Sequence, residues 1–585
     1  MDLERTSDLS RPLSELHDNE QLKFDSHYLR GTVEQSLADP VTGAITDDDT
    51  KLLKFFGIYQ QDDRDLRDER RRSKLEPHYQ FMVRVRLPGG VCTTSQWLAL
   101  EAAARETANG ALRLTTRQTF QFHGVFKPVL KRHVQSIVAA GLDTIAACGD
   151  DNRNVICTAN PLWSRAQAEV SDLAQRIGKH LLPRTAAYNE ILLEQASEAS
   201  RGEEEEPLYG RTYLPRKFKI AIAVPPHNDI DVFAHDLGFI AIVNNGSIEG
   251  YNVLVGGGMG MTHKVPATFP RLSDMAGFCA PEDVLLVAEH SMCIQRDFGD
   301  RKDRAHARFK YTIEDRGVEW FKAELSRRMM GRPLQPARPF VFESSADRYG
   351  WHQGEDGRWH YTLFIENGRI IDGPQRALMS GLREIAQLHT GVFALTTNQN
   401  ITIAGVSEAD KPRIEALLSK HGIENDISAT TLRQHSMACV AFPTCGLAMA
   451  ESERYLPGLL GKIEATVREL GLEREPITMR MSGCPNGCSR PYLAEIALVG
   501  KGPGKYNLYL GASASGDRLN ALYLENIGEP QILATLKQLL GRFAQERNAG
   551  ERFGDFLIRV GVVPAMLAGR DFQSLPLAVP KVVSA

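Results

Sequence analysis

The segment RLTTRQTFQFHGV, residues 113–125, returns later in the chain as ALTTNQNITIAGV, residues 394–406. The two copies align without a gap, and Leu, Thr-Thr, Gln and the closing Gly-Val are identical. A second, looser pair, GYNVLVGGG (250–258) and KYNLYLGAS (505–513), follows in the same order. Chance similarity between short apolar strands is the alternative. Two pairs in the same order favour a duplicated module whose halves are related by a pseudo-twofold axis.

Strand and helix patterns alternate around the first copy of the repeat. From Phe81 to Leu87 every second residue is large and apolar, and Arg84 and Arg86 fall between them. This alternation predicts a strand with both arginines on one face. A helical pattern over 94–109 follows, and the repeat itself predicts a further strand. Strand, helix and strand together predict a small α/β unit.

The first 75 or so residues are polar and dense in charge, above all DDRDLRDERRRSK (62–74). This composition predicts an extended arm with some helix from Thr50 to Tyr59. Two interpretations of the arm remain open. It is either a solvated tail or a docking arm for a partner protein.

Overall composition limits the class of protein. A length of 585 residues predicts several domains, and a net charge of −4 gives no electrostatic case for binding nucleic acid. The N-terminus has no apolar signal-peptide core, and no apolar run reaches the ~18 residues of a membrane span. Nine cysteines in so long a chain do not indicate a disulfide framework, so a reducing cytoplasm is the expected compartment.

Four cysteines occur in two pairs in the second half. Cys439 and Cys445 lie in SMACVAFPTCG (436–446), and Cys484 and Cys488 lie in SGCPNGCSRP (482–491). Four thiolates are a ligand set for an iron–sulfur cluster or a structural zinc. The first pair is spaced more widely than a usual zinc knuckle, and the Pro-Asn-Gly loop can turn backbone N–H groups toward sulfur. A cluster is therefore favoured over zinc, and over incidental cysteines.

Cations gather in the first half instead. They are Arg84, Arg86, Arg113, Arg117, Arg153, Lys217 and Lys219, in or beside predicted strands and turns. Any one of them alone could equally be a solvent-exposed side chain with no binding role. Together they are suited to phosphates or carboxylates, which they bind by charge-assisted hydrogen bonds. One half is therefore expected to bind an anion-rich ligand and the other half a metal cluster. This combination suggests electron delivery to a small oxyanion.

The sequence also resembles a known protein family over nearly the whole chain. It rests on VRVRLPGG (83–90), RLTTRQTFQFHG (113–124), NRNV (152–155), YLPRKFK (213–219), SMACVAFPTC (436–445), MSGCPNGC (481–488) and RFGDF (552–556). The paired cysteine motif resembles the siroheme-dependent sulfite and nitrite reductase family. The full set is similar to the hemoprotein (beta) subunits of its assimilatory, NADPH-dependent sulfite reductase branch.

The resemblance implies a siroheme and a [4Fe–4S] cluster that share one cysteine sulfur. The implied cluster ligands are Cys439, Cys445, Cys484 and Cys488, with Cys488 also bridging to the siroheme iron. The implied catalytic cations, which bind substrate and supply protons, are Arg84, Arg153, Lys217 and Lys219. The other implied siroheme-binding residues are Arg113, Arg117, Gln121 and Asn486.

The same resemblance implies an α+β fold: an internally duplicated siroheme sulfite/nitrite reductase fold with ferredoxin-like α/β units and pseudo-twofold symmetry. The expected division is an N-terminal arm (1–76), a ferredoxin-like half-unit (77–146), a siroheme- and substrate-binding domain (147–350), a second half-unit (351–424) and a cluster-bearing domain (425–585). The tail after Phe556 matches the family less distinctly, so it receives no role.

The implied reaction is the six-electron reduction of sulfite to sulfide in assimilatory sulfur metabolism and cysteine biosynthesis. VGGGMG (255–260) lacks a full dinucleotide fingerprint, so NADPH and flavin are expected only through a separate flavoprotein (alpha) subunit. The nearest rival is ferredoxin-dependent sulfite or nitrite reduction on the same fold. A rival of another class is a zinc-stabilised scaffold for an acidic partner.

Overall fold

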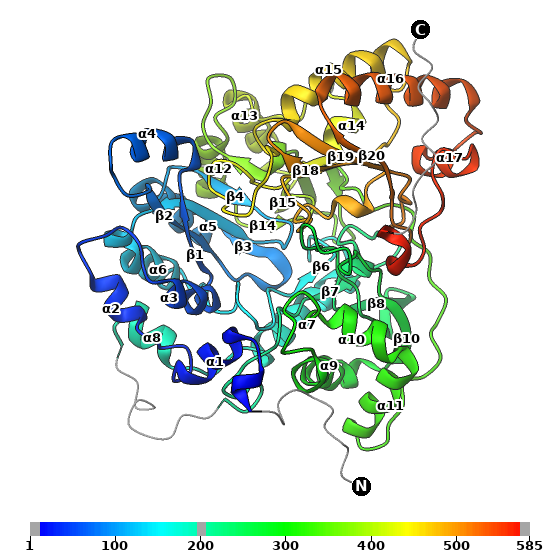
Figure 1. The fold of residues 1–585 in the computed structure, drawn as a ribbon. Helices are drawn as coiled ribbons and strands as arrows, with labels where there is room; N and C mark the ends of the chain where they lie inside the picture. Colours follow the sequence, from blue (N-terminus) through cyan, green and yellow to red (C-terminus); the bar gives the residue numbers. More distant parts are fainter. Residues whose placement is uncertain (1–11, 196–205, 427, 574–585) are drawn as a thin grey trace.

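A computed structural model describes residues 12–195, 206–426 and 428–573. These residues form four five-stranded sheets, which fall into two pairs of matching topology (Figure 1). One pair carries the repeat of 113–125, and the other carries the cation-rich and cysteine-rich loops. The predicted duplication is therefore confirmed.

The first pair of sheets is antiparallel throughout. Sheet one has the order β1 (Ile58–Asp62), β2 (Tyr79–Arg84), β5 (Phe120–Val125), β4 (Leu112–Leu114), β13 (Arg369–Ile370). Sheet two has the order β11 (Gly350–Gln353), β12 (Trp359–Leu363), β15 (Ile401–Val406), β14 (Val392–Leu395), β3 (Val91–Thr93). The two copies of the repeat supply β4–β5 and β14–β15.

These two sheets exchange their edge strands. Strand β13 comes from the second half of the chain but pairs with β4, placing Arg369 opposite Arg113. Strand β3 comes from the first half but pairs with β14. Trp97, on the helix that follows β3, is fully buried and packs its ring against Phe120 of one sheet and Phe393 of the other. The two halves therefore share one core.

The second pair of sheets is mixed. Sheet three has the order β6 (Ile156–Cys157), β7 (Ile220–Ala223), β8 (Leu237–Asn244), β9 (Ser247–Val255), β10 (Asp274–Cys279). Sheet four has the order β16 (Ser436–Ala438), β17 (Met479–Ser482), β18 (Ile496–Gly502), β19 (Lys505–Leu510), β20 (Ala521–Ile527). In both sheets the first three strands are parallel and the last two pair antiparallel. The looser sequence pair supplies β9 and β19, which occupy the same place in their sheets.

Helices cover these sheets on the outside. Those of the first pair are α5 (Thr94–Thr107), α6 (Leu130–Ala139), α12 (Leu378–Leu388) and α13 (Lys411–Lys420). Those of the second pair are α7 (Arg165–His180), α9 (Val284–Phe298), α10 (Phe309–Arg316), α11 (Val318–Arg328), α14 (Thr431–Gln434), α15 (Leu456–Glu469), α16 (Glu529–Glu546) and α17 (Phe553–Arg559). Helix α8 (Ala187–Leu192) packs against α6 instead. In Figure 1, α15 and α16 lie side by side above β18–β20. No helix within the described ranges is long and apolar enough to cross a membrane.

The N-terminal segment differs from the prediction of an extended arm. Residues 12–76 fold into α1 (Asp18–Asp25), α2 (Val33–Ala38), α3 (Asp47–Leu53), β1 and the short α4 (Arg67–Arg72). Leu29, Val33 and Phe56 are fully buried, and β1 forms the edge of sheet one. The prediction of an arm rested on the charge density of 62–74. The apolar residues that supply this packing are instead scattered over 29–58, where they form no regular pattern. Residues 1–11 lie outside the described part of the chain.

Candidate active site

A cavity lies where the two mixed sheets meet the first repeat. Its open space is about 810 Å³, part of it continuous with solvent. Its wall combines the β4–β5 turn (Thr116, Arg117), the segment before β7 (Lys217, Lys219), the loop after β9, the start of α10 (Arg308) and the loop between β17 and β18 (Asn486, Cys488). The structure thus brings predicted cations and a predicted metal ligand onto one surface.

Lys217 and Lys219 line this wall without a bonding partner for their ammonium groups among the described residues. Both are half-buried, and neither side chain makes a hydrogen bond or ion pair with any residue that the structure describes. Burial and neighbouring cations hold the pKa of each well below its ordinary value. Arg308, by contrast, pairs with Asp236 at 3.0 Å. The two lysines therefore lack the counter-charge that an anion in the cavity would supply.

Arg117 lies beside them in the turn of the first repeat. Its guanidinium donates to the carbonyl oxygens of Asn154 and Ile220, which fixes its direction. Burial, followed by repulsion from Arg153 and Arg490, lowers its pKa to about 9. This excess of buried positive charge is suited to a ligand that carries several carboxylates.

Arg84 and Arg153 are not among the residues that line the cavity. Arg153 donates from Nε to the Gly149 carbonyl oxygen at 2.9 Å, and Arg84 donates from Nη1 to Cys148 Sγ at 2.8 Å. With its amide oxygen turned toward Arg84, Gln121 accepts a further hydrogen bond at 2.6 Å. Arg153 still lowers the pKa values of Arg117 and Lys217, so it is close enough to act on the cavity electrostatically.

Arg113 points toward the cysteine segment instead of the cavity. It is buried, pairs with Glu453 at 3.1 Å and donates to the Ala438 carbonyl oxygen at 2.8 Å. Arg369 of the exchanged strand β13 shares the same Glu453. These contacts fix Ala438, the residue that precedes Cys439, so Arg113 helps to hold the cysteine segment in place. The predicted role of Arg113 in binding a siroheme stays a prediction.

The four cysteines converge because two parallel strands end at one sheet edge. Cys439 follows β16 directly, Cys484 and Cys488 follow β17, and the strands pair in parallel register. The Gly483 N–H donates to Cys439 Sγ at 3.3 Å. Arg64, from the N-terminal segment, donates to the Cys445 carbonyl oxygen at 2.9 Å and holds the remaining loop.

The electrostatics of these thiols are suited to a cationic metal centre. Burial and the neighbouring thiols raise the pKa of Cys439 to about 11, and the same two causes raise the pKa values of Cys445 and Cys484. Iron charge would compensate the thiolates, because metal binding displaces thiol protons. In the described part of the chain, no three His, Cys, Asp or Glu side chains are grouped to hold a single metal ion.

Gly483 provides a test of the cysteine arrangement. A Cβ at this position would lie 2.6 Å from Ala441 Cβ and 2.7 Å from the Ala450 carbonyl oxygen. Gly483→Ala is therefore expected to displace the cysteine loops and weaken cluster retention roughly tenfold, since overpacking costs about 1–3 kcal/mol. Gly446→Ala is the matched control, because its Cβ would meet nothing within 4 Å. Equal iron contents in the two purified variants would contradict this account.

Only one of the two pseudo-equivalent sites carries this chemistry. Strands β7–β8 and β17–β18 align without a gap, since Ile220 pairs with Leu237 as Met479 pairs with Ile496. Asp229 therefore stands where Cys488 stands in the other half. Asn398 replaces Arg117 and donates to the Ser345 carbonyl oxygen at 3.0 Å, so the segment before β11 covers the matching position.

Sequence reasoning missed Thr116, His235 and Arg490 on the cavity wall. Thr116 belongs to the Thr-Thr pair that both repeat copies keep, so the repeat contained a signal for it. His235 and Arg490 follow loops whose relation appears only when the two mixed sheets are compared.

Two family models match parts of the chain. The model of the "Nitrite/Sulfite reductase ferredoxin-like half domain" matches residues 73–132 and 352–421, and that of the "Nitrite and sulphite reductase 4Fe-4S domain" matches 173–333. The latter range contains Lys217 and Lys219 but none of the four paired cysteines. The matching topology of the mixed sheets identifies the cysteine-bearing segment as the second copy of that unit.

Full-length relatives are also found. Proteins named "Sulfite reductase [NADPH] hemoprotein beta-component" are 59% identical in Chromohalobacter salexigens, over 96% of this chain and 98% of the relative, and 59% identical in Bordetella petrii, over 97% of each. The NirA protein of Mycobacterium tuberculosis has the same fold, with a TM-score of 0.77 and 22% identity over 95% of this chain and 99% of NirA. The chain therefore belongs to the nitrite and sulfite reductase family, within its group of sulfite reductase hemoprotein beta-components.

Proposed function

We propose that the chain reduces sulfite to sulfide as the hemoprotein subunit of an assimilatory sulfite reductase, in cysteine biosynthesis. The observation that carries the proposal is the shared wall of Lys217, Lys219 and Cys488. The two lysines form no ion pair with a described residue, and they line the same cavity as a thiol that would bind metal. The names of the two full-length relatives support the same reaction.

Two prosthetic groups fit the residues present. Cys439, Cys445, Cys484 and Cys488 would hold a [4Fe–4S] cluster, and Cys488, the exposed member of the four, would also bind the iron of a siroheme in the cavity. Arg117 and Asn486 would line that siroheme. When bound, the coupled groups would supply electrons to the substrate one at a time.

The chain's own residues would bind the anion and deliver protons. Reduction of hydrogen sulfite to hydrosulfide consumes six electrons and six protons and releases three waters. The ammonium groups of Lys217 and Lys219 would hold the oxyanion by charge-assisted hydrogen bonds. Because their pKa values are already lowered, they give up protons readily, whereas Arg84 and Arg153 serve as fixed positive charge.

Electrons would come from NADPH through a separate flavoprotein (alpha) subunit. In this chain the segment VGGGMG (255–260) ends at the cavity wall, where Met259 and Gly260 lie, instead of opening a dinucleotide-binding helix. None of the nine cysteines, all of which lie in the described ranges, forms a disulfide, and the reducing cytoplasm is the proposed compartment.

Helix α4 is the proposed docking site for that subunit. Its Arg71 side chain is 81% exposed, and Arg64, just before the helix, contacts the loop of Cys445. Arg71→Glu/Arg72→Glu is expected to reduce NADPH-driven turnover severalfold while turnover with a small artificial reductant stays at the wild-type level. Equal losses with both electron sources, or no loss, would contradict docking at α4. A truncation of 1–75 would not test it, because residues 12–76 belong to the fold.

The deciding experiment is an absorption spectrum of the purified protein, with iron and acid-labile sulfide assayed on the same sample. Siroheme bands with four cluster irons and one heme iron per chain are expected. A colourless protein that binds only zinc would favour the scaffold. Sulfite and nitrite are then compared by kcat/KM, and a preference for nitrite would favour the rival reductase.

A further inference from the structure

Asp231 and Arg490 are equivalent residues in the two halves of the mixed-sheet pair. Each directly precedes a short 3-10 helix, Val232–Ala234 or Pro491–Leu493, and each has a left-handed backbone, with φ of 50° and 51°. The gapless register of the adjoining strands makes them counterparts under the pseudo-twofold relation. On a true twofold axis a residue meets its own copy, so an Asp–Arg pair requires that the halves have diverged.

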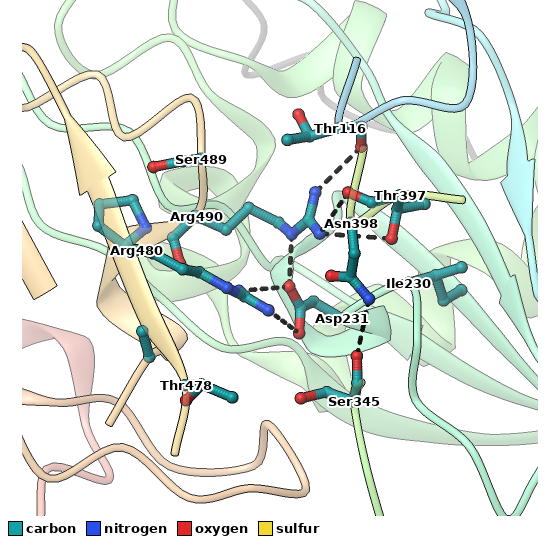
Figure 2. A network of polar contacts seen from close by, with 12 residues as sticks. Thr116, Ile230, Asp231, Ser345, Thr397, Asn398, Thr478, Arg480, Ser489 and Arg490 are labelled. Atoms are coloured by element: carbon teal, nitrogen blue, oxygen red, sulfur yellow. Dashed lines mark hydrogen bonds and ion pairs between the residues drawn. The ribbon is translucent and has the colours of Figure 1, made fainter. Parts of the chain in front are cut away.

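The two residues meet in a buried ion-pair network that also includes Arg480. Arg490 donates from Nε to Asp231 Oδ2 at 2.5 Å, and Arg480 donates from Nη1 to the same oxygen at 2.6 Å (Figure 2). The exposed fractions of Asp231, Arg480 and Arg490 are 1%, 2% and 6%. We name Asp231, Arg480 and Arg490 the axis clamp.

The axis clamp is connected to Cys488 by two routes. Arg490 donates to the Thr116 carbonyl oxygen at 3.0 Å, and the Thr116 hydroxyl donates to the Cys488 carbonyl oxygen at 3.1 Å. In addition, Arg480 donates at 3.2 Å to the carbonyl oxygen of Arg490, two residues after Cys488. Because Thr116 precedes Arg117, the clamp fixes Cys488 relative to a cation of the cavity.

A third contact extends the network to the second repeat. Arg490 donates to the Thr397 carbonyl oxygen at 3.2 Å (Figure 2). The Thr397 hydroxyl donates to the carbonyl oxygen of Asp229, two residues before Asp231. Thr116 and Thr397 are themselves equivalent in the repeats. The clamp therefore ties both turns of the repeat to the two loops that adjoin the axis.

The charges of the clamp argue for a role beyond stability. Burial by itself raises the pKa of Asp231, but Arg480 and Arg490 outweigh it, so the carboxylate stays ionised. Well-packed apolar residues often stabilise a core as much as a buried ion pair does. The best-attested use of such a pair is to fix one register among several, which here is the register of the Cys488 loop.

We propose that Asp231, Arg480 and Arg490 are positioning residues that set Cys488 against the cation-lined cavity. The proposal rests on the proposed function, in which Cys488 belongs to both the cluster and the siroheme. Displacement of the loop would then alter the coupling between the two iron centres before it altered their presence.

The test uses Asp231→Asn in the full-length holoprotein. The variant is expected to retain its iron and acid-labile sulfide but to show a shifted siroheme absorption spectrum and weaker magnetic coupling in Mössbauer spectra. Since a displacement of about 1 Å can cost on the order of 100-fold in rate, kcat is expected to fall about 10- to 100-fold. KM for sulfite is expected to change less, because Lys217 and Lys219 are retained.

Glu464→Gln is the matched control. Glu464 is 4% exposed and accepts from Arg433 at 2.6 Å and from Thr430 at 2.7 Å, so this variant also weakens a buried carboxylate–arginine pair. Glu464→Gln is expected to lower Tm about as much as Asp231→Asn does. Its siroheme absorption and Mössbauer spectra are expected to match those of the wild type. Wild-type spectra in both variants would reduce the clamp to a purely structural role and overturn the proposal.

Arg480→Lys keeps the proposal testable if Asp231→Asn does not fold. Lysine retains the charge beside Asp231 but cannot also reach the Arg490 carbonyl oxygen, so a smaller shift of the same spectra is expected. An unchanged spectrum would overturn the proposal. The wild-type protein separates the two ideas: uncoupled centres there would refute the assignment of Cys488, whereas coupled centres that no clamp variant alters would refute only the clamp.

Discussion

Cys488→Ser is expected to disturb the cluster and the siroheme together and to reduce sulfite reduction to background. Cys488 is exposed on the cavity wall, and its proximity raises the pKa values of Cys439, Cys445 and Cys484. It therefore belongs both to the cysteine group and to the cavity. A serine hydroxyl is a harder and more basic ligand than a thiol, so it replaces neither metal bond well.

The measurement is iron, acid-labile sulfide and absorption on one purified sample. Cys293→Ser is the control, since Cys293 is a buried cysteine of α9, away from the cavity wall. The control is expected to keep its colour and its iron. If Cys488→Ser kept normal siroheme bands and full cluster iron, the shared-ligand assignment would be wrong.

Lys217→Met and Lys219→Met are each expected to lower sulfite turnover by about 100-fold or more while leaving the siroheme spectrum intact. Removal of one preorganised donor from a developing anion commonly costs on the order of 100- to 1,000-fold in kcat. Methionine keeps much of the length of the side chain but offers neither charge nor proton. The spectrum should persist because Arg117 and the cysteine loops are untouched.

Steady-state kinetics with a small artificial reductant test the lysines without the partner subunit. Lys302→Met, at an exposed position outside the cavity wall, is the control and should behave as wild type. Unchanged turnover in Lys217→Met or Lys219→Met would remove that lysine from the mechanism. Loss of the siroheme bands would instead assign it to cofactor retention.

The duplication and the four cysteines could be read from the sequence because both leave local signals. Thr-Thr and Gly-Val occur at fixed offsets in the two repeats, and the cysteines occur in closely spaced pairs. The convergence of Lys217 with Cys488 was expected only through the family resemblance. It depends on parallel strands that bring distant loops to one sheet edge.

Other features left no signal that periodicity could detect. Strand β13 is two residues long and β3 is three, too short for any pattern, and each joins the sheet of the other half. Composition predicts an extended N-terminal arm because charged residues outnumber apolar ones there, although Leu29 and Val33 are buried in the fold. Asp231 and Arg490 look like ordinary loop residues until the pseudo-twofold relation places them together.

The exchanged edge strands have a consequence for synthesis on the ribosome. Sheet one keeps an open edge at β4 until Arg369 and Ile370 emerge, about 255 residues after the end of β4 at Leu114. An unpaired edge is a template for association with other chains, and domains generally fold as units in N- to C-terminal order. The nascent first half therefore cannot complete its sheet alone, and a message truncated before codon 369 yields a polypeptide with an uncovered strand. Folding and quality control of this protein are thereby tied to the completion of both halves.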